Sequence, residues 1–133
     1  DHGRAGKLIA DSCFLAGLRK IETKWEGQSQ EAWQPGPVFP SIPARFSEPD
    51  FIVDISDSFK RKMEAVQCFR TQFFSDGSDE PETYISRSGF LEKISARAYD
   101  LGQRIGVAYG EGFNCVSDIG ISSLDDLIYP EFP

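Results

Sequence analysis

Hydrophobic residues recur at the spacing of a helix in three parts of the chain. Intervals of three and four positions place apolar side chains along one face in residues 3–18, 57–71 and 88–105. Gly106 follows the third of these segments, and glycine is the residue that most often ends a helix. A further short helix is predicted over residues 123–128. We therefore expect three main helices, each with one face turned towards a core.

Strand patterns are fewer and shorter. β-branched and aromatic residues run almost unbroken through residues 50–55, which predicts a strand buried on both faces. Residues 38–42 predict a short edge strand, because Pro40 has no N–H to donate to a neighbouring strand. Residues 106–113 are expected to return as an extended, glycine-flanked segment. A thin sheet against three helices predicts an α/β fold, and it is what would remain if the strands of the first half of such a fold were missing.

Two polar, turn-rich stretches separate these elements. Residues 21–37 carry Trp25 and Trp33, and residues 74–86 are acidic. We expect both stretches to be mobile loops, and the tryptophans to form a lid or an interface or to dock on the chain's own core. Neither a linker nor an internal repeat divides the sequence, so a single unit spanning residues 1–133 is predicted.

Composition limits the class of partner. Of the 133 residues 40% are hydrophobic, which is enough for a globular domain. The net charge is −7 and the 14 Lys and Arg residues are scattered, which argues against a nucleic-acid surface. No apolar run approaches the roughly 18 residues of a membrane span. We expect a small-molecule or protein partner, and neither nucleic acid nor membrane.

The three cysteines, Cys13, Cys68 and Cys115, are an odd number at wide spacing without a CxxC pair. This pattern favours reduced thiols in the cytoplasm over a disulfide framework or a zinc ribbon. Cys13 and Cys68 fall inside predicted helices, where a free cysteine usually acts as a small hydrophobe. A catalytic thiol is the less favoured alternative, because His2 is the only histidine that could activate one.

Asp1 and His2 stand directly before the first predicted helix. Read together with residues 3–20, they resemble the second metal-binding segment of the LmbE-like (PIG-L) zinc N-deacetylases, where His-Pro-Asp-His opens a helix and of which only Asp-His is present here. The likeness continues in order to about Phe113 through EPDFIVDIS, GFLEKISARA and IGVAYGEGF. The most similar branch is the deacetylase of bacillithiol biosynthesis. The resemblance implies the C-terminal portion of a Rossmann-like domain, beginning inside the metal motif and lacking its N-terminal half.

The same resemblance implies a divided zinc site. In the family, a His-Pro-Asp-Asp motif supplies two zinc ligands and the general base, and the last histidine of His-Pro-Asp-His supplies the third ligand. By position His2 matches that third ligand, and Asp1 matches the residue before it, which would orient the site. Zn²⁺ is therefore the expected cofactor, with Asp1 as a catalytic residue and His2 as a metal ligand.

Two further residues are expected near the substrate. Arg97 matches a recurring arginine of the family, and its planar donor fork would suit a substrate carboxylate such as malate or a buried carboxylate such as Glu111. Glu111 lies between two glycines, which a subunit contact explains as well as catalysis does. We also expect a homo-oligomer.

The activity that the resemblance implies is zinc-dependent removal of the N-acetyl group from a sugar conjugate, N-acetylglucosaminyl malate. The parent protein is thus expected to be a metal-dependent amidohydrolase. The chain alone is expected to be inactive, because the missing N-terminal half carries the other ligands. The alternative is a non-catalytic binding or assembly module derived from the same fold.

Overall fold

The computed structural model describes residues 2–41, 47–69, 84–87 and 89–129, and the chain forms two compact units. The first unit comprises Asp1–Ser41 with Asn114–Asp118, and the second comprises Ile42–Phe113 with Ile119–Pro133. The single unit that the sequence predicts stays a prediction, since two compact units can still fold as one domain. Helices and small antiparallel sheets are both present, which is a mixed α and β architecture.

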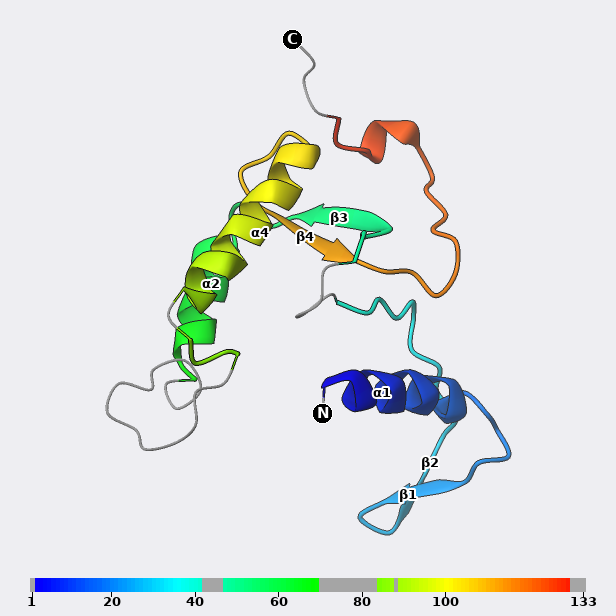
Figure 1. The fold of residues 1–133 in the computed structure, drawn as a ribbon. Coiled ribbons are helices and arrows are strands. Elements are labelled where there is room, and N and C mark those ends of the chain that lie inside the picture. The colour runs from blue at the N-terminus through cyan, green and yellow to red at the C-terminus, as the bar shows by residue number, and fades with distance from the viewer. Residues whose placement is uncertain (1, 42–46, 70–83, 88, 130–133) are drawn as a thin grey trace, which may run out of the picture. The chain divides into compact units, whose positions relative to one another are not determined.

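The first unit opens with α1 (His2–Ala16), which confirms the first predicted helix (Figure 1). None of the helix's residues is buried, and Leu8 is 67% exposed. On the neighbouring stripe Lys7 Nζ lies 3.0 Å from the Asp11 carboxylate, a pairing one helical turn apart. The amphipathic pattern therefore predicted the helix correctly, but its apolar stripe is exposed and not turned towards a core.

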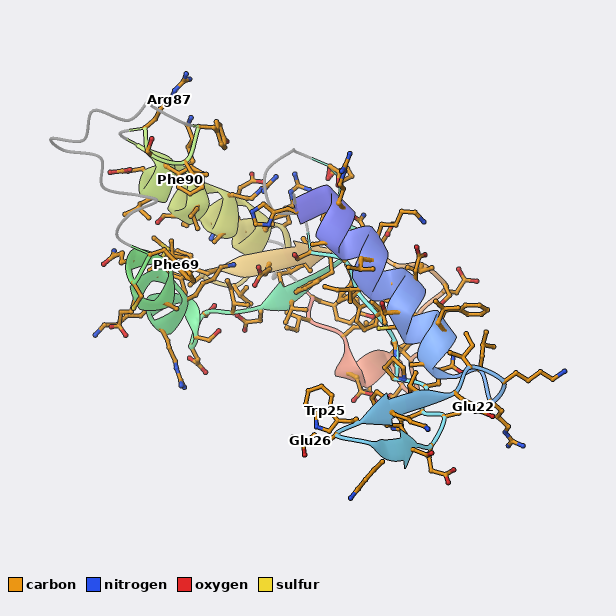
Figure 2. All side chains as sticks on the ribbon, turned by 90° about the horizontal axis from the view of Figure 1, so that it is seen from below. Glu22, Trp25, Glu26, Phe69, Arg87 and Phe90 are labelled. Carbon is orange, nitrogen blue, oxygen red and sulfur yellow. The ribbon has the colours of Figure 1, made fainter. Side chains whose placement is uncertain are left out.

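A hairpin follows where a loop was predicted. Strands β1 (Thr23–Trp25) and β2 (Gln28–Gln30) pair antiparallel around a two-residue turn. Glu26 has φ 50° and Gly27 has φ 80°, the two positive values that a type I′ turn requires. Figure 2 shows Trp25 and Glu26 at this turn. The loop prediction was wrong here because both strands are three residues long and all their side chains are exposed, so no alternating pattern marks them.

The second unit is built on the antiparallel pair β3 (Phe51–Asp54) and β4 (Gly110–Phe113), as Figure 1 shows. Helix α4 (Phe90–Arg104) packs against this pair and contributes the buried apolar side chains of Ala98 and Leu101, which are 4% and 7% exposed. These positions confirm the third predicted helix and the extended segment after it.

The expectation that β3 is buried on both faces was wrong. Val53 is exposed, and every residue of β3 is at best half-buried. The physical reason is that Ile52, paired with Gly112, faces α4, whereas Val53, paired with Glu111, lies on the opposite face of the sheet. Among the described residues this sheet has two strands. The β-branched and aromatic residues predicted the strand correctly, but they did not indicate how many layers of structure surround it.

Glycines bring α4 and β4 into backbone contact. A Cβ on Gly102 would lie 2.7 Å from the Tyr109 nitrogen and 2.8 Å from the Val107 carbonyl oxygen. A Cβ on Gly110 would lie 2.9 Å from the Gly102 nitrogen. Gly106, at φ 75°, ends the helix as predicted, and the Val107 N–H then donates to the Gly102 carbonyl at 3.0 Å. The helix and the strand that follows it are thus one tightly turned motif.

The remaining elements are short. Helix α2 (Phe59–Gln67) lies inside its predicted range, and Phe59 stacks on Tyr109 with ring centroids 3.8 Å apart. The 3-10 helix η1 (Leu124–Asp126) occupies the last predicted helix. The predicted edge strand at residues 38–42 is reduced to a single bridge at Ser41 within the described part. Most of the predicted loop 74–86 lies outside the described residues, and loop mobility stays a prediction.

Within the described ranges, none of the helices combines the length and the apolar character needed to cross a membrane.

We predict that Gly102→Ala destabilises the chain by about 1–3 kcal/mol, the usual cost of forcing an extra methyl group into a packed site. Its Cβ would meet backbone atoms of residues 107 and 109, which have little freedom to shift. The matched control is Gly6→Ala in α1, where nothing lies within 4 Å of the added Cβ. That change should stabilise α1 by about 0.5–1 kcal/mol through helix propensity. Urea unfolding followed by circular dichroism distinguishes the two, and equal effects would contradict the close approach.

Candidate metal and substrate site

His2 is the first residue of α1, and its side chain is exposed. His2 stands in the first turn of α1, where backbone N–H groups have no partners within the helix. Burial of His2 in an apolar core would have opposed a metal role. The structure instead leaves His2 exposed. Asp1, the expected catalytic residue, lies outside the described residues.

The described residues do not complete a zinc site on their own. A catalytic zinc has three protein ligands, whereas His2 is the chain's only histidine. Among the described residues, no group of three or more His, Cys, Asp and Glu side chains lies together in a way that could hold a metal ion. The imidazole of His2 is a chemically suitable single ligand, but we assign no reaction step to a metal held by these residues alone.

Glu111 pairs with a residue that the sequence analysis did not identify. Its Oε1 lies 2.6 Å from Lys62 Nζ, and the two side chains are 33% and 32% exposed. Lys62 is on α2 and Glu111 is on β4, so the ion pair links this helix to this strand. The two residues are 49 positions apart in the sequence, and no local pattern connects them. The contact gives Glu111 a structural role in this unit.

Arg97 lies half-buried on α4, one position before the buried Ala98. The structure thus places Arg97 and Glu111 on adjacent elements of the second unit, α4 and β4. His2 belongs to the first unit, so these residues are not brought together within one unit.

A second polar contact lies at the end of β3. The Asp54 carboxylate accepts hydrogen bonds from the Ser56 hydroxyl at 2.6 Å and from the Ser56 N–H at 2.9 Å. The Ser56 hydroxyl oxygen in turn accepts the Tyr109 N–H at 3.2 Å. These two hydrogen bonds hold the pKa of Asp54 below its usual range, and the bond from the Ser56 hydroxyl has the larger effect. This chain of bonds ties β3 to the segment that leads into β4.

All three cysteines lie among the described residues, and none of them forms a disulfide there. Cys13 is half-buried within α1, and Cys68 caps the C-terminal end of α2, where its Sγ donates to the Glu64 carbonyl at 3.4 Å.

No protein-family model matches the chain. The likeness to the LmbE-like deacetylases therefore depends on the residues quoted for it, and it remains a basis for proposals.

We predict that Ser56→Ala raises the pKa of the Asp54 carboxyl towards its ordinary value, because the hydrogen bond that lowers this pKa most, from the Ser56 hydroxyl, is lost. A lowered pKa in the folded chain stabilises it above the ordinary carboxyl pKa of about 3.9, and this contribution disappears as the pH falls through the folded pKa. Carbon-13 NMR titration of the carboxyl resonance measures the change. Ser58→Ala is the control, because that hydroxyl donates to the Ile55 carbonyl instead. An unchanged Asp54 titration in Ser56→Ala would refute the assignment.

Proposed function

We propose that the chain is the C-terminal part of an LmbE-like (PIG-L) zinc-dependent N-deacetylase with a Rossmann-like fold. The main supporting observation is that a helix follows the Asp-His pair and that His2 on this helix is exposed, since the family's second metal motif is likewise followed by a helix. The order of the other elements adds support. Strand β3, helix α4 and strand β4 coincide with the FIVD, FLEKISARA and GEGF segments on which the resemblance depends.

The proposed reaction is removal of acetate from an N-acetylglucosamine conjugate, and N-acetylglucosaminyl malate is the nearest candidate. In this proposal His2 contributes one zinc ligand and Asp1 orients the site. The other two ligands and the general base come from residues that the family places before Asp-His. The bound zinc supplies an activated water and a polarised amide carbonyl. The parent protein is then an amidohydrolase, and this chain alone is inactive.

Arg97 is the proposed contact for the acidic end of the substrate. A guanidinium offers two parallel donors to a carboxylate, and malate carries carboxylates. The half-buried position of Arg97 on α4, a helix that contacts β4, supports this role. Glu111 is the less favoured substrate residue, since Lys62 already neutralises its charge at 2.6 Å. We propose that Glu111 acts mainly by holding α2 to β4.

The exposed apolar stripe of α1 supports the proposal that this chain lacks part of the domain. An isolated helix of 15 residues is marginal in water, and most helical stability in proteins comes from packing of an apolar face. Leu8, Ile9 and Leu15 lie on or beside this stripe and are all exposed. We propose that the upstream half of the same protein covers them. We also propose a homo-oligomer and a cytoplasmic location.

A binding or assembly module is the second candidate. The observation that favours it is that three large aromatic residues of the first unit, Phe14, Trp25 and Trp33, are all more than half exposed. In this alternative the chain binds other proteins and performs no chemistry. The two candidates differ in whether His2 matters: it is essential to the deacetylase and dispensable to the module.

For the metal we predict that this chain joined to the upstream half binds one zinc per chain and releases acetate from N-acetylglucosaminyl malate. The chain alone should do neither, because in this proposal two of the three zinc ligands lie in the upstream half. In the joined protein His2→Ala should lower zinc affinity by more than about 100-fold, beyond the range typical for residues that only support a ligand. Metal analysis and acetate release are the measurements.

The matched control for His2→Ala is Lys7→Ala, an exposed change one turn further along α1 that should leave zinc and activity unchanged. Turnover by the chain alone, or full activity in His2→Ala, would overturn the proposed zinc role. A joined protein without activity whose partner binding survives His2→Ala would favour the assembly module.

For the apolar stripe we predict that Leu8→Asp and Leu15→Asp each weaken association with a separately supplied upstream half by at least about tenfold. Burial of a leucine side chain is worth roughly 1.5–3 kcal/mol, and a buried aspartate adds a further cost. Lys7→Ala is again the control, since it removes an exposed polar side chain from the same helix. Isothermal titration calorimetry measures the affinity, and unaltered binding in both aspartate variants would show that another surface is used.

For the substrate contact we predict that Arg97→Gln raises KM for N-acetylglucosaminyl malate by roughly 10- to 100-fold with little change in kcat. This corresponds to loss of a hydrogen bond to a charged group, about 1.5–3 kcal/mol. The test includes a substrate in which a methyl group replaces malate, for which Arg97→Gln should leave KM unchanged. An equal rise for both substrates would show that Arg97 acts through the fold and not through malate.

A further inference from the structure

We draw no further inference here: the strongest candidate, the exposed surface patch on the β1–β2 hairpin where Trp25 stands beside Glu26, carries nothing because no part of the described structure shows what covers it.

Discussion

The second unit depends on the close approach of α4 to β4. Gly102 and Gly110 let the backbones meet at distances that no side chain would permit, and the turn at Gly106 returns the chain directly onto the helix it has just left. Leu101 and Ala98 are buried at this contact. Because the apolar core in the described part of the chain is small, tight backbone packing replaces the layers of side chains that a larger domain would use.

The other contacts of this unit extend from that motif. Once β4 is placed, Tyr109 stacks on Phe59, Lys62 reaches Glu111, and Ser56 accepts the Tyr109 N–H. Each of these three contacts joins α2 or the segment after β3 to residues 109–111. Arg104, at the end of α4, adds a salt bridge to Glu48 ahead of β3. Polar and aromatic contacts at the surface, individually modest in energy, thus set the positions of the elements that the small core does not reach.

The sequence predicted those elements whose signal is local. The helical spacing of residues 3–18 and 88–105 and the glycine at 106 were sufficient to place α1 and α4. The hairpin was missed because Glu26-Gly27 is a weaker turn signal than Asn-Gly and its strands bury nothing. Burial of β3 was overestimated because apolar content does not reveal how many layers surround a strand. Candidate residues could be named from a family likeness, but the pairing of Lys62 with Glu111 depends on tertiary packing.

Strand β4 has two unlike faces, and this difference fixes its register. Gly110 and Gly112 alternate with Glu111 and Phe113, so one face is bare backbone and the other carries a charge and a ring. A slip of one residue against β3 would turn the carboxylate of Glu111 into the space where α4 admits only hydrogen, and would leave the ring of Phe113 without the stacking partner it has in Phe51. The alternation of glycine with larger residues in β4 thus disfavours a misaligned pairing that a two-stranded ribbon would otherwise tolerate.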